Sequence, residues 1–209
     1  VVNTPDDSND NQCDTNHCSL REAINAANAN VGPDTISFSA LDATGGDITI
    51  ALNSLLPPIL DDATTIDGAT VQGYTSDPLI NIVKSSGSLE HAFSIQGSSC
   101  VIRGFSLAGY GTFPTGEYPE SWEYTGAAIE ISGMNNSIEN NTIGWGAWNN
   151  SVGIHLAGGG NTVLGNVIGG NGIGIRINGP GQIIYGNKIG NDGSTANPNR
   201  VGIWDISGS

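Results

Sequence analysis

The sequence predicts an all-β fold in which short parallel strands stack as a solenoid, with one short α-helix near the N-terminus. Three observations support this prediction. After residue 34, short apolar segments alternate with turns rich in Gly, Asn and Asp. A strand-and-turn motif returns at intervals of 21 to 25 residues. The chain also contains 31 glycines but only 6 Lys and Arg residues, which is typical of turn-rich β proteins.

The helix is predicted at Ser19–Asn30. Ser19 and Glu22 have the spacing of a capping box. Apolar residues follow at the intervals that place them on one helix face, namely Leu20, Ala23, Ile24 and Ala27. Because so short a helix is marginal alone, we expect this face to pack on the strands that begin at residue 35. The expected division is an N-terminal segment, 1–34, and stacked strands over 35–209.

The repeat is clearest in three aligned segments, Asn136–Gly144, Asn161–Gly169 and Gln182–Gly190. Their aligned asparagines, Asn141, Asn166 and Asn187, are 25 and 21 residues apart, which we interpret as the length of one coil. We expect a ladder of amide side chains hydrogen-bonded from coil to coil about 4.8 Å apart. The alternative is that asparagine stands there because it tolerates left-handed turns.

A second motif, with apolar residues two apart, recurs in step with the first at Ile129–Ile131, Ile154–Leu156, Ile175–Ile177 and Ile203–Asp205. This spacing puts both apolar side chains on one face of a strand. An earlier copy, Phe93–Ile95, lies 36 residues before its counterpart, and this longer gap marks an insertion at about 109–126.

The run Cys18-Ser-Leu-Arg-Glu-Ala-Ile24, followed by Asp34-Thr-Ile-Ser-Phe38, resembles the CSLREA domain of bacterial secreted and cell-surface proteins. The motifs Thr65–Gly68 and Val101–Gly104 and the repeated G-N-x-I-G resemble those of right-handed parallel β-helix repeat proteins. The resemblance implies a right-handed parallel β-helix whose N-terminal end is capped by the helix. It implies no particular activity, since this architecture carries lyases, hydrolases and adhesins alike.

The strand motif predicts a column of outward side chains across successive coils: Ser94, Glu130, His155, Arg176 and Trp204. Such a face suits carbohydrate, because sugar sites combine acid/base groups with aromatic rings. The catalytic candidates are Glu130, His155 and Arg176. The alternative is that these side chains are simply exposed to solvent, and that opposite charges on neighbouring strands attract one another.

Catalysis is not the favoured interpretation of this face. A glycoside hydrolase needs two suitably spaced carboxylates, and the column supplies Glu130 with only Asp205 at its edge. A polysaccharide lyase needs a base and a charge-neutralising group, and the sequence shows no cluster of that kind.

The insertion is rich in aromatic and acidic residues. The carbohydrate-binding candidates are Trp122 and Tyr124 in the insertion and Trp204 in the outward column. An exposed aromatic loop on a rigid scaffold suits recognition. The alternative is that it folds back as a satellite cluster over the solenoid.

The carboxylates of Asp7, Asp10 and Asp14 lie close together in the sequence, and oxygen ligands of this kind suit Ca²⁺. The segment lacks the glycine and the terminal glutamate of an EF-hand loop. A solvated acidic terminus is the alternative. No other cofactor is expected.

Three cysteines cannot all pair within one chain. Cys13 and Cys18 are close enough for a small-loop disulfide in an oxidising compartment, and the alternative is two free thiols. Cys100 is expected to be a small core residue. Asn135, Asn140 and Asn149 begin N-glycosylation sequons near predicted turns.

The charge excludes some partners. Asp and Glu outnumber Lys and Arg by 20 to 6, and the net charge of −14 repels nucleic acid. No transmembrane run is present, so we expect no membrane insertion.

The sequence therefore predicts a secreted or cell-surface structural or adhesive protein. Its expected partners are glycans and either a second copy, stacked head to tail into a filament, or further coils of a longer chain. The alternatives are a polysaccharide lyase, a glycoside hydrolase and a carbohydrate-binding solenoid without turnover.

Overall fold

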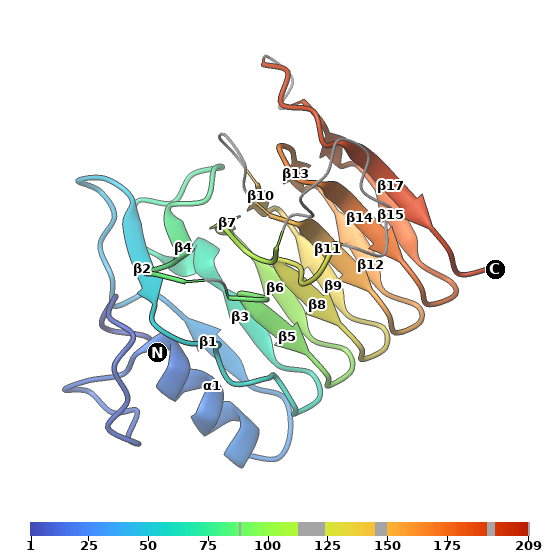
Figure 1. Cartoon of the computed structure of the whole chain (residues 1–209). Coiled ribbons are helices and arrows are strands. Elements are labelled where there is room, and N and C mark those ends of the chain that lie inside the picture. The colour runs from blue at the N-terminus through green and yellow to red at the C-terminus, as the bar shows by residue number, and fades with distance from the viewer. Residues whose placement is uncertain (88, 113–123, 145–149, 192–194, 209) are drawn as a thin grey trace.

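The computed structural model describes residues 1–87, 89–112, 124–144, 150–191 and 195–208. Most of its regular structure is β, in three parallel sheets accompanied by one α-helix and a short 3₁₀ turn at Gly68–Thr70 (Figure 1). No helix among these residues is long and apolar enough to cross a membrane.

The helix α1 spans Leu20–Ala29 and lies beside β1 at the N-terminal end of the stack (Figure 1). The predicted capping box is present: the Glu22 N–H donates to Ser19 Oγ at 3.2 Å, and the Ser19 N–H donates to Glu22 Oε2 at 2.8 Å. The predicted apolar face, Leu20, Ala23, Ile24 and Ala27, is buried in the main core. Asn28 adds a polar link, because its Nδ2 donates to the Pro58 carbonyl and its Oδ1 accepts from the Leu60 N–H, both at 2.8 Å.

The strands divide among three parallel sheets. Sheet 1 contains β1 (Thr35–Ser37), β3 (Thr65–Asp67), β6 (Val101–Arg103), β9 (Ser137–Glu139), β12 (Thr162–Leu164) and β15 (Ile183–Tyr185). Sheet 2 contains β2 (Ile48–Leu52), β4 (Ile80–Lys84), β7 (Phe105–Ala108), β10 (Thr142–Ile143), β13 (Val167–Ile168) and β16 (Lys188–Ile189). Sheet 3 contains β5 (Phe93–Ile95), β8 (Ile129–Ile131), β11 (Val152–Leu156), β14 (Ile173–Ile177) and β17 (Val201–Asp205).

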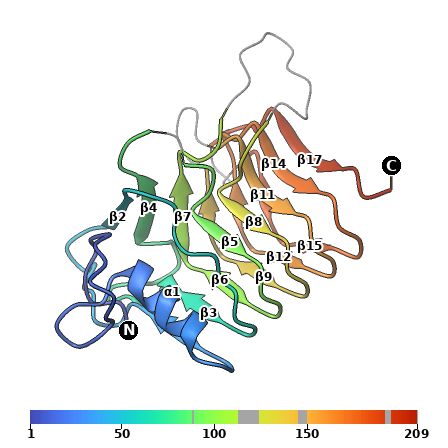
Figure 2. The ribbon, with the colours of Figure 1, turned by 60° about the horizontal axis from the view of Figure 1, so that its bottom comes forward.

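From β5 onward the chain visits the sheets in a fixed cycle, sheet 3, sheet 1, sheet 2, and each pass adds one strand beside the previous strand of the same sheet. We call one such pass a coil. Figures 1 and 2 show the passes following one another along the molecule from α1 to β17. The order is compatible with a β-solenoid.

The observed registers match the predicted repeat. Ile129 pairs with Ile154, Ile154 with Ile175, and Ile175 with Ile203. The longer offset is also confirmed, because Phe93 pairs with Ile129. Side chains alternate between the two faces of each strand, and the inward residues are the buried ones.

Three columns of amide side chains join neighbouring coils where the chain passes from one sheet to the next. Each amide residue lies just before a strand of the next sheet. Ladder 1 contains Asn136, Asn161 and Gln182; ladder 2 contains Asn141, Asn166 and Asn187; ladder 3 contains Asn150, Asn171 and Asn199.

Ladder 2 confirms the predicted column. The backbone N–H of Asn141 donates to Asn166 Oδ1, and that of Asn166 to Asn187 Oδ1, both at 2.9 Å. The side-chain Nδ2 groups make parallel bonds of 3.1 and 3.0 Å to the same oxygens. Asn141 and Asn166 are buried, so these bonds satisfy polar groups that water does not reach.

Ladders 1 and 3 repeat the arrangement at the other two corners, where the sequence analysis did not predict it. The N–H of Asn161 donates to Gln182 Oε1 at 3.0 Å. The N–H of Asn171 donates to Asn199 Oδ1, also at 3.0 Å. Cys100 is fully buried at the first corner, as expected for a small core residue, and its N–H donates to Asn136 Oδ1.

Other asparagines, outside the ladders, adopt the left-handed turns that were the alternative explanation for the repeated asparagines. Asn135 and Asn140, each directly before a ladder asparagine, have φ of 57° and 51° and are exposed. Buried asparagines therefore form the ladders, and exposed neighbours make the left-handed turns.

We predict that Asn166→Ala lowers the free energy of unfolding by about 1–3 kcal/mol, because it leaves the buried Asn141 N–H without an acceptor. Denaturant unfolding followed by circular dichroism measures this change. Asn25→Ala, on the exposed face of α1, is the matched control and should change stability by less than about 0.5 kcal/mol. Equal effects of the two substitutions would show that the ladder contributes nothing specific.

At four glycines in a column, the backbones of consecutive coils lie too close together to leave room for a side chain: Gly97, Gly133, Gly158 and Gly179. A Cβ at Gly158 would overlap the carbonyl oxygen of Gly133, and a Cβ at Gly179 would overlap that of Gly158. Glycine is required at these positions because the preceding coil's backbone occupies the space of a side chain.

Gly158→Ala is accordingly expected to destabilise the protein by about 1–3 kcal/mol, since neighbouring coils must separate to admit the methyl group. Gly45→Ala serves as the control, because its Cβ would meet nothing within 4 Å. Thermal unfolding of both variants tests the prediction, and a tolerated methyl at Gly158 would contradict the close approach.

Candidate functional site

The predicted outward column lies along sheet 3. Ser94 pairs with Glu130, Glu130 with His155, His155 with Arg176, and Arg176 with Trp204. All five side chains are partly exposed, and the strand neighbours of Ser94, Glu130, His155 and Arg176 are buried. The structure thus brings together the residues that the sequence placed on one face.

Glu130 and His155 form the polar centre of this face. His155 Nδ1 lies 2.8 Å from Glu130 Oε1, and His155 Nε2 lies 2.9 Å from Asn178 Oδ1. Both ring nitrogens therefore face oxygen atoms, which hold the imidazole between neighbouring coils. Asn178 was not predicted; it directly follows the last residue of the strand motif, Ile177.

Arg176 and Trp204 occupy the C-terminal part of the column. Arg176 Nη1 donates to the Tyr124 carbonyl at 3.4 Å. Trp204 packs against a small cluster formed by Tyr124, Ala127, Val152 and Ile173. The indole is consequently fixed against the scaffold and only partly available to a ligand.

Tyr124 was predicted to bind carbohydrate, and the structure corrects this. Its side chain is only 4% exposed, and its ring occupies the space where a Cβ of Gly172 would be. A ring buried in this way has no free face for a sugar, so for Tyr124 the satellite-cluster interpretation holds. Trp122, the other candidate in the insertion, lies outside the described residues.

His91 is a further titratable residue of this region that sequence reasoning missed, because it precedes β5 and belongs to no repeated motif. Burial lowers the pKa of its imidazole, and the nearby carboxylates of Glu130 and Glu90 only partly oppose that effect. The charge of Glu130 thus acts on His91 as well as lying beside His155.

Hydrolysis requires two free carboxylates, and the described residues of the column do not supply a second one beside Glu130. Asp205, the edge candidate, accepts hydrogen bonds from the N–H and Oγ of Ser207 at 2.9 and 2.6 Å. These bonds lower the pKa of the Asp205 carboxyl and engage it in a local turn. Among the described residues the column therefore offers one carboxylate, Glu130, and a hydrolase pair is not assembled.

The predicted Ca²⁺ ligands do not form one site. Arg21 Nε and Nη2 donate to Asp7 at 2.8–3.0 Å, and Asp7 also accepts the Asn53 N–H. Asp14 accepts the N–H groups of Asn16 and His17 within its own turn. Asp7 is thus committed to an ion pair that ties the N-terminal segment to α1.

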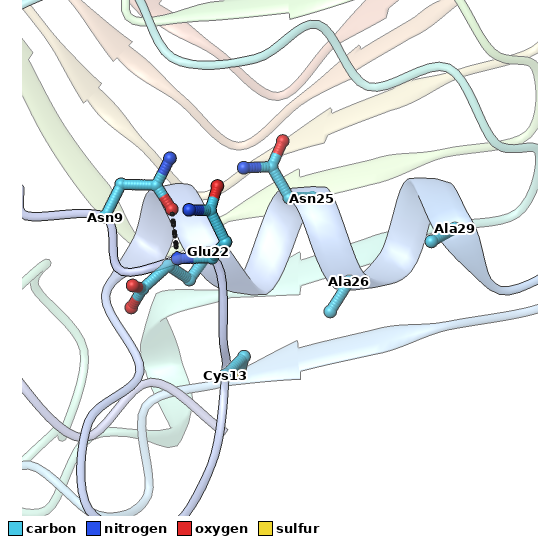
Figure 3. A pocket seen from close by; sticks show the side chains of 7 residues that line it. Asn9, Cys13, Glu22, Asn25, Ala26 and Ala29 are labelled. Atoms are coloured by element: carbon cyan, nitrogen blue, oxygen red, sulfur yellow. Dashed lines mark hydrogen bonds between the residues drawn. The ribbon is translucent and has the colours of Figure 1, made fainter.

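Asp10 instead approaches His17 and Glu22, whose ligand atoms all lie within 4.8 Å of one another. Both oxygens of Glu22 are already engaged, since Oε1 accepts the Asp10 N–H at 2.7 Å and Oε2 accepts the Ser19 N–H. This group therefore stabilises the start of α1. Figure 3 shows Glu22 beside a small cavity between the N-terminal segment and α1, lined by Asn9, Asn11, Cys13, Glu22, Asn25, Ala26 and Ala29.

His17 is the titratable centre of this cap. Its Nδ1 lies 2.9 Å from Glu22 Oε2, and its Nε2 lies 3.2 Å from Asp6 Oδ1. Desolvation lowers the pKa of the imidazole, but the Asp6 hydrogen bond and the Glu22 charge outweigh it and raise the pKa above 6.5. For Glu22, desolvation raises the carboxyl pKa, but backbone hydrogen bonds from Ser19 and Asp10 bring it below its ordinary value.

A raised folded-state pKa means that protonated His17 stabilises the fold below pH 6.5 and that this contribution disappears as pH rises through the raised value. We predict that the stability difference between wild type and His17→Asn shrinks from about pH 5.5 to about pH 8.5. Denaturant unfolding at several pH values measures the difference. His91→Asn should show the opposite slope, because the pKa of His91 is lowered. A pH-independent difference for His17 would contradict the assignment.

The remaining sequence candidates are also placed. Cys13 and Cys18 form a disulfide with a Cα–Cα distance of 4.3 Å, so the free-thiol alternative does not apply. The sequon asparagines Asn135 and Asn140 are exposed. Asn149 lies outside the described residues.

Comparison with protein-family models, with curated proteins and with solved structures gives no match to this chain.

Proposed function

We propose that this chain is a right-handed parallel β-helix that serves as a structural or adhesive scaffold outside the cell or at its surface. The observation that carries the proposal is the set of three amide ladders. From Asn136 onward they link coil to coil at all three corners, so the joints between sheets in this part of the stack are held by hydrogen bonds. A scaffold of this kind keeps its outer faces in fixed positions.

The cyclic order of the sheets supports a closed helical path. From β5 onward, three successive strands enter three different sheets, and the fourth pairs in parallel with the first. Right-handed crossovers between parallel strands are strongly favoured, because twisted strands pack back onto the sheet in that sense. The resemblance of Cys18–Ile24 to the CSLREA domain agrees with this architecture.

An extracellular location is supported by the disulfide and by the charge. Disulfides persist in oxidising environments, and the Cys13–Cys18 bridge constrains the segment that packs against α1. The net charge of −14 keeps such a protein soluble. Exposed Asn135 and Asn140 are accessible to glycosylation in an organism that modifies sequons.

Carbohydrate binding without turnover is the second candidate function. The observation that favours it is the row of His155, Arg176 and Trp204 on one outer face, where buried Arg176 Nε has no hydrogen-bond partner among the described residues. A polysaccharide-active enzyme is less well supported, because among the described residues of the column only Glu130 supplies a free carboxylate.

A screen of acidic and neutral polysaccharides should show no turnover by the wild-type chain, with reducing-end release and ultraviolet absorbance of unsaturated products as readouts. Turnover abolished by both Glu130→Ala and His155→Ala would reject the scaffold proposal in favour of an enzyme. Binding without turnover, lost in Arg176→Ala and Trp204→Ala but kept in Arg103→Ala on sheet 1, would identify sheet 3 as a carbohydrate surface.

A further inference from the structure

Arg176 is a charged side chain without a counter-ion in the described part of the chain. Arg21 and Arg103 each pair with an aspartate, at 2.8 and 2.6 Å. Arg176 makes no ion pair with any described residue, and its Nη1 donates to the Tyr124 carbonyl at 3.4 Å, which is longer than most N–H···O hydrogen bonds. Its Nε is buried and has no hydrogen-bond partner among these residues. The guanidinium is therefore positioned but not neutralised.

The missing counter-ion is unusual in a chain so rich in carboxylates. Asp and Glu outnumber Lys and Arg by 20 to 6. A cation that is partly removed from water loses hydration, and an opposite charge normally compensates for that loss. Arg176 lies on β14, with β11 on one side and β17 on the other, so the stack surrounds it on both sides. An arginine in this state suits an anion that binds from outside.

The neighbouring residues of the column do not supply this anion. His155 and Trp204 flank Arg176 on the adjacent strands. Glu130 stands two strands away, about 9–10 Å along the column. Its carboxylate lies 2.8 Å from His155 Nδ1, so its charge is directed to the imidazole. Among the described residues of the column, Arg176 is the charge that stays uncompensated.

Tyr124 positions Arg176 and Trp204 together. Its carbonyl accepts the hydrogen bond from Arg176, and its buried ring belongs to the cluster against which Trp204 packs. The two residues are directly opposite each other in the register of β14 and β17. Neighbouring strands are about 4.8 Å apart, so a ligand group of the size of a sugar ring spans both side chains.

The chemistry of this pair favours a carboxylate on a sugar. Because Nε is enclosed, an outside anion meets the guanidinium through its terminal nitrogens. These nitrogens carry N–H donors side by side in one plane, an arrangement that matches the two oxygens of a carboxylate. The indole of Trp204 offers an apolar plate beside them, against which a sugar ring packs.

The distribution of charge along the chain permits an anionic ligand at this position. Residues 1–139 contain 18 acidic and 3 basic side chains, a net charge of −15, whereas residues 140–209 contain 2 and 3, a net charge of +1. The strands β11, β14 and β17 all belong to the second part. The segment that carries Arg176 is thus close to neutral, although the whole chain is strongly acidic.

We propose, resting on the carbohydrate-binding function above, that Arg176 and Trp204 form a subsite for a uronic acid unit of an acidic polysaccharide. The terminal nitrogens of Arg176 bind the carboxylate of the sugar, and the indole of Trp204 lies against its ring. Tyr124 is a positioning residue, because it contacts both side chains while its own ring is buried.

Isothermal titration calorimetry at about 0.15 M salt tests the subsite. The probes are oligosaccharides of polygalacturonate, alginate and hyaluronan, each beside its methyl ester, in which the carboxylates carry no charge. At least one acid form should bind, and its ester should bind at least about tenfold more weakly. Dextran sulfate is the comparison for other anions. If it bound as tightly as the best uronate, the surface would attract any polyanion, and the carboxylate subsite would be overturned.

Arg176→Ala should raise the dissociation constant of the acid form at least about tenfold and leave that of the ester within about twofold. Arg176→Lys should restore only part of the preference for the acid form, because it keeps the charge without the planar donors. Trp204→Ala should weaken both forms alike, since the indole contacts the ring and not the carboxylate. Lys84→Ala, which removes one positive charge from sheet 2, is the control and should change neither.

The outcomes separate the subsite from the functions on which it rests. Equal binding of acid and ester forms would overturn the uronate subsite and leave carbohydrate binding in place. No binding of any acid form by a chain with native circular dichroism would also overturn it, and neutral glycans in the screen above then decide whether carbohydrate binding stands. Reduced stability of Arg176→Ala with an unchanged affinity for the acid form would show that Arg176 has a structural role instead.

Discussion

A parallel stack of coils must satisfy the backbone N–H groups at every corner, because the strand ladders stop where the chain leaves one sheet for the next. A buried amide hydrogen without an acceptor costs about 1–3 kcal/mol, and each coil has three corners. In this protein an amide oxygen from the following coil accepts the corner N–H groups of Asn136, Asn141, Asn161, Asn166 and Asn171, as the Asn141–Asn166–Asn187 column illustrates. The spacing of the sheets, the burial of the inward isoleucines and the alignment of the outer faces all depend on these bonds.

The same constraint positions the candidate surface. Because consecutive coils stay in register, Glu130 and His155 stand directly opposite each other on adjacent strands. Asn178 then closes the contact on the other side of the imidazole. Contacts from the coils on both sides thus hold the imidazole in place.

Much of this arrangement follows from the sequence, for identifiable reasons. Apolar residues two apart predict one buried strand face, and identical motifs predict the register of Ile129, Ile154 and Ile175. Ladder 2 was predictable because all three members are asparagines in the same short motif. Ladder 1 was not, because Gln182 replaces asparagine. In ladder 3, Asn199 lies 28 residues after Asn171 instead of 21 or 25.

Other features depend on contacts that no local pattern encodes. Asp7 was assigned to Ca²⁺ from its acidic neighbours, but Arg21 of α1 binds it. Tyr124 was assigned to sugar binding from its aromatic neighbours, but the absence of a side chain at Gly172 gives its ring a buried place. In both cases a residue distant in sequence decides the role.

Residue-resolved hydrogen exchange tests the central claim most directly, because it reports on the corner N–H groups themselves. The amides of Asn141, Asn166 and Asn171 should exchange as slowly as those of the inner strands, since each is bonded to the next coil. Exchange of these three amides as fast as in exposed loops would show that the amide ladders do not hold the coils together.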